Sequence, residues 1–198
     1  MLRRPGLLLL VVVVAPAELY AQEQSAKPRS APSGVSECTQ ELFERAERSF
    51  ESRLRDSNLR VPAERDLKEA VELCADTPGF YLAEEHLKIV QEELAESNLN
   101  IALFYLKKFH DGKRGKQGAL SRLKSIVERY PNYSKLDQVL SLLAQINLAD
   151  NNLDAAAAYY QRIVKDFPVS QYAGEAWLQL SVIDAMRSSS AIPSDDIR

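Results

Sequence analysis

The sequence is poor in the residues that build sheets, nucleotide-binding loops and disulfide scaffolds. Seven glycines and no long alternating runs of β-branched residues argue against a β-sandwich and against a glycine-rich nucleotide-binding fold. Two cysteines are too few for a scaffold built from disulfides. A basic surplus is also missing, since the formal net charge is −3, so general nucleic-acid binding is not expected. The chain of 198 residues is 45% apolar and 27% charged, which is typical of one folded globular domain.

The N-terminus has the layout of an export signal. Arg3 and Arg4 precede an unbroken apolar run over residues 7–14, and candidate cleavage sites end at Ala17 and Ala21. A membrane anchor is the alternative, but the run has less than half of the roughly 20 residues that cross a bilayer. We therefore expect residues 1–21 to be a signal peptide that is removed on export to the periplasm.

Both ends of the remaining chain are predicted to be loose. Residues 22–37 are rich in Ser, Pro, Gln and Ala, which predicts a flexible linker, and residues 187–198 predict a disordered tail. The first cysteine after the apolar run is Cys38, and the preceding Val35-Ser36-Glu37 is not a lipid-attachment sequence, so no lipid anchor is expected. In an oxidising compartment Cys38 and Cys74 could pair and add about 2–4 kcal/mol of stability, or they could stay as two small buried thiols.

Apolar residues three and four positions apart predict an all-α fold. Residues 38–79 should form a helical hairpin that ends at the turn Thr77-Pro78-Gly79, and a long helix should follow over about residues 81–109. Two further hairpins are expected after this helix.

The later part of the chain repeats itself with a period of 37 residues. Ala119, Ile126, Val127, Tyr130 and Pro131 recur as Ala156, Ile163, Val164, Phe167 and Pro168, and Leu140 and Leu143 recur as Trp177 and Leu180. The small residue lets two helices approach closely, the larger ones fill the space between units, and proline ends the second helix. We expect a helix-turn-helix repeat array, a short right-handed solenoid, in which Trp177 packs inside.

These positions resemble the tetratricopeptide repeat. In the middle unit its large, small, aromatic and proline positions are taken by Leu140, Leu143, Ala144, Ala156, Tyr160, Ile163 and Pro168. The segments ELAE (93–96), IALFYLK (101–107), ERYP (128–131) and DFPVSQYA (166–173) further resemble the BamD family. This family comprises periplasmic repeat lipoproteins of the machinery that inserts β-barrels into the outer membrane. The resemblance places BamD-like repeats at residues 80–186, although the lipid-attachment cysteine is missing and the array is shorter than the family's.

The resemblance implies a non-catalytic periplasmic scaffold associated with the outer membrane. Its partners would be β-barrel assembly components or unfolded clients, with no nucleic acid, small-molecule substrate, cofactor or metal. An adaptor of cell division or peptidoglycan synthesis is the alternative, because such repeat proteins share parts of these motifs. An enzyme is not expected: Cys38 has no evident base, and His86 and His110 have no partner at metal-ligand spacing.

Two surfaces are candidates for partner contact. In tetratricopeptide repeats the concave face is lined by the first helix of each pair. By position, this predicts a site of Glu96, Leu99, Leu103, Lys107, Gln138, Ser141, Gln145, Glu175 and Leu178. For the leucines, packing in the core is an equally open interpretation. A basic turn of Lys108, Lys113, Arg114 and Lys116 is either a solvated insertion loop or a contact for anionic lipid headgroups or an acidic partner.

Overall fold

The computed structural model describes residues 38–75, 77, 79–108 and 113–190. The predicted signal peptide, the linker, His110 and residues 191–198 lie outside this part of the chain. The helices are α1 (Gln40–Ser52), α2 (Arg60–Leu73), α3 (Gly79–Lys108), α4 (Lys113–Arg129), α5 (Leu136–Ala149), α6 (Leu153–Asp166) and α7 (Ala173–Ser190), with a 3-10 turn at Ser57–Leu59. No strand occurs in the described residues, so the predicted all-α class is confirmed. The tail predicted from Arg187 begins too early, because α7 continues to Ser190.

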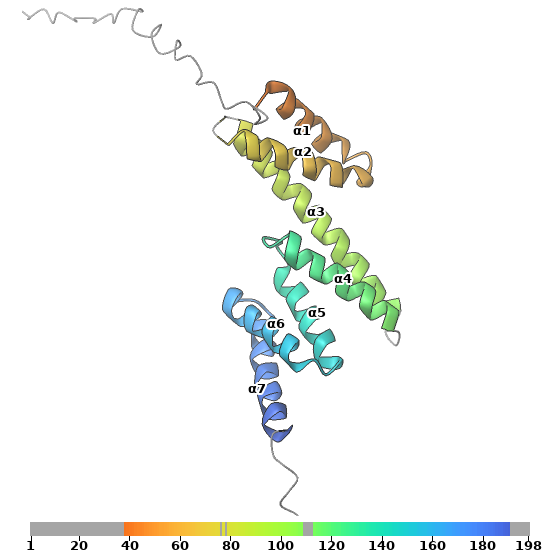
Figure 1. The fold of residues 1–198 in the computed structure, drawn as a ribbon, viewed down its shortest axis with the longest axis vertical. Helices are drawn as coiled ribbons and strands as arrows, with labels where there is room; N and C mark the ends of the chain where they lie inside the picture. The colour runs from red at the N-terminus through yellow and green to blue at the C-terminus, as the bar shows by residue number, and fades with distance from the viewer. Residues whose placement is uncertain (1–37, 76, 78, 109–112, 191–198) are drawn as a thin grey trace, which may run out of the picture. The chain divides into compact units, whose positions relative to one another are not determined.

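The helices pack in chain order, each against the next, and α1 also touches α3 (Figure 1). The 30 residues of α3 make it long enough to serve two pairs. Figure 1 shows α2 beside its first half and α4 beside its second half. Buried side chains from all seven helices form one continuous core. None of the helices in the described residues is both long and apolar enough to cross a membrane.

The 37-residue repeat correctly predicts the centre of this core. Ala119, Ile126, Ala156 and Ile163 are all fully buried. A tetratricopeptide-like array of paired helices is therefore confirmed. The prediction is wrong for Trp177, which is 63% exposed although its counterpart Leu140 is fully buried. Helix α7 packs against α6, but no described helix covers its outer side in the way that α6 covers α5.

The first hairpin is closed at its ends. A disulfide joins Cys38, just before α1, to Cys74, just after α2, with their Cα atoms 5.0 Å apart. The Oγ1 of Thr39 caps α1 by accepting a hydrogen bond from the Leu42 N–H at 3.2 Å. At the start of α3, a Cβ on Gly79 would lie 2.9 Å from the Phe43 ring, so glycine is what lets α3 begin directly against α1.

The turns between the later helices use residues suited to tight backbone geometry. Asn151, between α5 and α6, has a φ of 56°, a left-handed conformation that asparagine adopts more readily than most residues. The next residue, Asn152, caps α6 by accepting a hydrogen bond from the Ala155 N–H. Pro131 and Pro168 each lie two residues after the last helical residue, Arg129 of α4 and Asp166 of α6, and so follow the helix ends as the sequence predicts.

Candidate functional site

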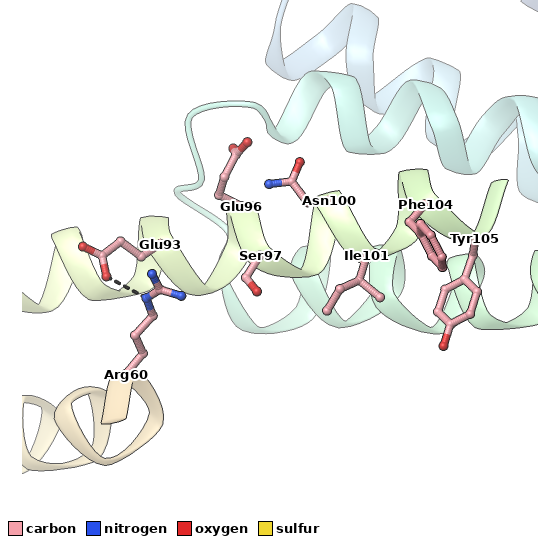
Figure 2. A pocket seen from close by; sticks show the side chains of 8 residues that line it. All are labelled: Arg60, Glu93, Glu96, Ser97, Asn100, Ile101, Phe104 and Tyr105. Carbon is pink, nitrogen blue, oxygen red and sulfur yellow. Dashed lines mark hydrogen bonds and ion pairs between the residues drawn. The ribbon is translucent and has the colours of Figure 1, made fainter. Parts of the chain in front are cut away.

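A groove of about 640 Å³ follows the exposed side of α3 (Figure 2). Most of its lining comes from α3 at spacings of three and four residues, so these side chains lie along one side of the helix. Arg60 is the contribution of α2, and Figure 2 shows its side chain reaching up to α3. The lining residues are Arg60, Glu93, Glu96, Ser97, Asn100, Ile101, Phe104 and Tyr105.

One end of the groove is held by an ion-pair cluster around Glu93. Its carboxylate accepts a hydrogen bond from Arg60 Nε at 3.0 Å and forms an ion pair with Arg53 Nη2 at 3.2 Å. Arg53 is itself buried and stacks on the Phe50 ring, 3.6 Å from the ring centroid. The arrangement fixes Arg60 at the rim of the groove, because a side chain pinned through Nε has little rotational freedom left.

The other end of the groove is apolar and open to solvent. Phe104 is 54% exposed, and Ile101 and Tyr105 lie next to it in the lining. The Lys108 ammonium lies 5.3 Å from the centre of the Phe104 ring, which is a cation–π contact. An exposed aromatic ring beside a hydroxyl (Ser97) and a side-chain amide (Asn100) is a surface that can take both an apolar side chain and a peptide backbone.

A second depression, of about 510 Å³, extends the groove toward the N-terminus of α3. Its lining residues are Lys88, Ile89, Glu92, Glu93, Glu96 and Lys135, so Glu93 and Glu96 belong to both depressions. The two together form a continuous strip along α3 from Lys88 to Tyr105. We call this strip the α3 groove.

Glu96 also has a structural role that the sequence did not reveal. Its carboxylate accepts hydrogen bonds from the Tyr133 hydroxyl and from Lys135 Nζ, the latter at 2.7 Å. The hydrogen bonds from Lys135 and then Tyr133 hold the pKa of Glu96 below its usual range. Burial and the hydrogen bond to Glu96 raise the pKa of Tyr133. Glu96 therefore fastens the α4–α5 turn to α3.

Glu92 reinforces this fastening one helical turn earlier. It accepts hydrogen bonds from the Ser134 hydroxyl and from the Ser134 backbone N–H, the latter at 3.2 Å. We call the contacts of Glu92 and Glu96 with residues 133–135 the α3 latch. Because the latch forms one wall of the groove, the same carboxylates position α5 and shape the surface that faces solvent.

The predicted concave-face residues do not come together in this groove. Glu96 alone lines it. Leu99 is 2% exposed and Leu103 packs against the core, so for these two leucines the packing interpretation holds. Ser141 is only 3% exposed, so it does not lie on an open face as predicted. Gln145 is exposed and donates a hydrogen bond to Ser141, Gln138 is partly buried, and Lys107, Glu175 and Leu178 are exposed outside the α3 groove.

Apart from Glu96, the sequence analysis missed every residue that lines the groove. These residues are Arg60, Lys88, Ile89, Glu92, Glu93, Ser97, Asn100, Ile101, Phe104, Tyr105 and Lys135. The predicted stripe on α3 was displaced by one residue, which rotates it about 100° around the helix. A signal was present, because α3 carries apolar residues on more than one side. Packing on one side had to leave Ile101 and Phe104 partly uncovered. Arg60 had no sequence signal, since its partner Glu93 is 33 residues away.

The structure also places the predicted basic turn and His86. The residues predicted as a basic turn are helical: Lys108 ends α3, and Lys113, Arg114 and Lys116 lie in the first turns of α4. His86 stacks on Phe50 with 3.6 Å between ring centroids, and its Nδ1 lies 2.9 Å from Glu47 Oε1. The role of His86 is therefore to join α1 to α3.

Paired helices stacked in series, with a mixed polar and apolar groove along one of them, define a tetratricopeptide-like scaffold. A family model described as YfiO, outer membrane lipoprotein, matches residues 37–158. Because the match covers more than half of the sequence, the chain belongs to this family, the BamD-type outer membrane lipoproteins. No curated protein and no solved structure matches the chain.

Membership has two consequences. The family is one of non-catalytic helical scaffolds, and it implies protein partners in outer membrane assembly in general. The match also begins at residue 37 and so includes α1 and α2. The sequence resemblance began only at residue 80, so it had left out a hairpin that is part of the family's array.

Proposed function

We propose that this protein is a non-catalytic scaffold that binds an extended segment of a partner or client protein in the α3 groove during β-barrel outer-membrane protein assembly. The observation that supports the proposal is the groove itself. It combines an exposed aromatic ring with amide, hydroxyl and charged groups along one helix.

The dimensions suit an extended peptide. From Lys88 to Tyr105 the groove follows a helix that rises 1.5 Å per residue, which gives a length of roughly 25 Å. An extended chain rises about 3.3 Å per residue, so about seven residues fit along the groove. A small molecule would occupy only part of such an open strip.

The chemistry of the lining is mixed, which favours a peptide over a highly charged ligand. The second depression and the Glu93 cluster carry three carboxylates, Glu92, Glu93 and Glu96, facing three cations, Lys88, Arg60 and Lys135. Charges of both signs leave no strong field for a polyanion or a polycation. Ser97 and Asn100 can exchange hydrogen bonds with a backbone, while Ile101 and Phe104 can bury an apolar side chain.

Site-specific photocrosslinking in intact cells tests the proposal. A photoreactive phenylalanine analogue replaces Phe104 in the groove, and in a matched control it replaces Tyr81. Tyr81 is an aromatic residue of the same helix that is 75% exposed but lies outside the groove lining. We expect position 104 to capture components of β-barrel assembly or unfolded barrel precursors, and position 81 not to.

Two results would contradict the proposal. Equal capture from both positions would mean that the groove is not the binding site. Capture of division or peptidoglycan enzymes from position 104 would keep the groove and move the function to the cell wall.

A binding measurement sharpens the same test. With the captured segment as a synthetic peptide, Phe104→Ala should weaken binding about tenfold or more, because exposed aromatic anchors dominate interface energies. The free energy of unfolding should change little, since more than half of the ring is in water. Tyr81→Ala serves as the control, and unchanged affinity in Phe104→Ala would remove that ring from the site.

A further inference from the structure

Helix α4 differs in charge from every other helix of the described residues. It carries six cations, Lys113, Arg114, Lys116, Arg122, Lys124 and Arg129, and one acid, Glu128. The chain as a whole has a net charge of −3, and α1, α2, α3, α5 and α7 each carry more acidic than basic residues. A concentrated positive charge in an acidic protein is a specific feature of this helix and not a consequence of composition.

Part of this charge lies on the side of the helix that faces away from the core. Ala119, Leu123 and Ile126 are fully buried and face the core. Arg114, Gln117, Ser121, Lys124 and Glu128 are exposed at spacings of three and four residues, so this face carries two cations and the one acid of the helix. No large apolar side chain of α4 is among the exposed ones. The outer face is therefore polar, and its cations Arg114 and Lys124 lie about 15 Å apart along the helix, with the exposed Arg122 beside them.

Part of this charge is not neutralised inside the protein. Lys116 pairs with Asp150 at 2.5 Å and Arg129 with Glu64 at 3.1 Å. Arg122 donates to the neutral amide of Asn98, which leaves its charge in place. Within the described part of the chain, Arg114 and Lys124 form no ion pair. Lys107, exposed in the last turn of α3, adds a further cation near the beginning of α4.

We propose that the outer face of α4 binds the phosphate groups of anionic phospholipids, with the helix lying along the membrane surface. Membership in a family of outer membrane lipoproteins places a bilayer next to this protein. A protein partner would be expected to need an aromatic or aliphatic anchor, and the outer face of α4 has none. A membrane surface needs only the charge, because clusters of cations bind anionic headgroups without insertion.

The contact leaves the α3 groove free. The residues that line the groove come from α2, α3 and the α4–α5 turn, and none lies on α4. The lipid contact therefore sets how the scaffold is oriented on the membrane, whereas the groove determines what the scaffold binds.

Vesicle sedimentation tests the proposal with the full exported protein. The probes are vesicles of phosphatidylcholine alone and vesicles that also contain phosphatidylglycerol. The test variant is Arg114→Glu/Lys124→Glu. The control variant is Arg55→Glu/Lys165→Glu, which makes the same change in net charge at exposed positions away from α4. All proteins share the same N-terminal region, so its contribution to vesicle binding cancels in the comparison.

We expect tighter binding to the phosphatidylglycerol vesicles, decreasing as salt is raised. Each exposed cation at such a surface contributes about fivefold in partitioning, so the test variant should lose about 25-fold or more. The control variant should lose much less. Circular dichroism should show both variants folded, since all four side chains are exposed.

Three results would overturn the proposal. Equal losses in both variants would show that only net charge matters. Unchanged binding in the test variant would remove the α4 face from the contact. The wild-type protein could also bind polyglutamate through Arg114 and Lys124 and bind no vesicle. This result would show that the face binds an acidic protein segment.

Discussion

Helices α5 and α7 occupy equivalent positions in successive repeats but bury different surfaces. Leu140 and Ser141 on α5 are fully and almost fully buried. Their counterparts 37 residues later, Trp177 and Leu178, are 63% and 70% exposed. Ile146 and Ile183, also counterparts, are both buried, at 7% and 0%. One side of the repeat is thus covered in both helices and the other side only in α5.

The exposure of these positions differs because α5 and α7 have different neighbouring helices, and not because of the side chains themselves. Helix α5 lies against both α4 and α6, whereas α7 packs mainly against α6. In a repeat array each unit buries its apolar face only against adjacent units. At the two compared positions the larger side chains are on α7, Trp177 against Leu140 and Leu178 against Ser141, so side-chain size does not explain why they are exposed.

The largest expected loss of stability comes from changing a buried residue of α5. Leu140→Ala should destabilise the protein by about 3 kcal/mol, because it removes a fully buried side chain and leaves a cavity in the core. The free energy of unfolding, measured by urea titration with far-ultraviolet circular dichroism, checks this. Leu140→Met is the control, and it should cost less than about 1.5 kcal/mol because its volume is similar. A loss below about 1 kcal/mol in Leu140→Ala would mean that α5 is not packed as described.

The next effect concerns how the turn before each helix is fastened. The turn before α5 is held by the α3 latch, and the turn before α7 by a hydrogen bond from Ser170 Oγ to Asp137 at 2.5 Å. Glu96→Gln should destabilise by about 1–2 kcal/mol, since it removes the negative charge that pairs with Lys135 and weakens both hydrogen bonds to this side chain. Asp137→Asn should cost less, because both donors to Asp137, the Ser170 hydroxyl and the Gln138 N–H, are neutral, so no ion pair is lost. Equal losses in urea titrations would show that the two turns are fastened alike.

The pH dependence of the stability loss in Glu96→Gln gives a second check on the α3 latch. The pKa of Glu96 is lower in the folded protein than its usual value of 4.5. Its stabilising effect is therefore present above about pH 4.5 and lost as the pH falls through the lower folded value. The difference in unfolding free energy between wild type and variant should shrink below pH 4.5. A difference that stays constant would mean that the charge of Glu96 does not contribute.

The smallest effect is expected on the uncovered side. Trp177→Ala should change the free energy of unfolding by less than about 1 kcal/mol, although tryptophan is the largest side chain in the protein. Ile183→Ala on the same helix is the contrast, and it should cost about 2–5 kcal/mol because Ile183 is fully buried. Similar losses from both variants would mean that the outer side of α7 is covered in solution.

The sequence predicted what depends on spacing within a repeat. The all-α class and the burial of Ala119, Ile126, Ala156 and Ile163 follow from a period that is visible in the residues. Trp177 was predicted wrongly because its burial depends on whether another helix packs against it. The period of the repeat does not show which helices are neighbours. The same limit explains the first hairpin, whose weak repeat pattern hid its membership of the family array.

The candidate site was predicted less well than the fold. Glu96 lines the groove, but Leu99 is buried, because one residue of error in phase turns a side chain from solvent into the core. The contacts that shape the groove join residues far apart in sequence, such as Arg60 with Glu93 and Tyr133 with Glu96. Such pairs follow from the packing of the helices, and a single sequence does not specify them.

The disulfide between Cys38 and Cys74 determines how the array responds to mechanical force. Any pull on the chain ahead of Cys38 passes through the sulfur bridge to Cys74 and from there into α3. The residues between the two cysteines, with α1 and α2, lie in a covalent loop that carries no tension. The backbone of α1 and α2 is thereby shielded from tension, and under reducing conditions the same pull would begin to unravel α1.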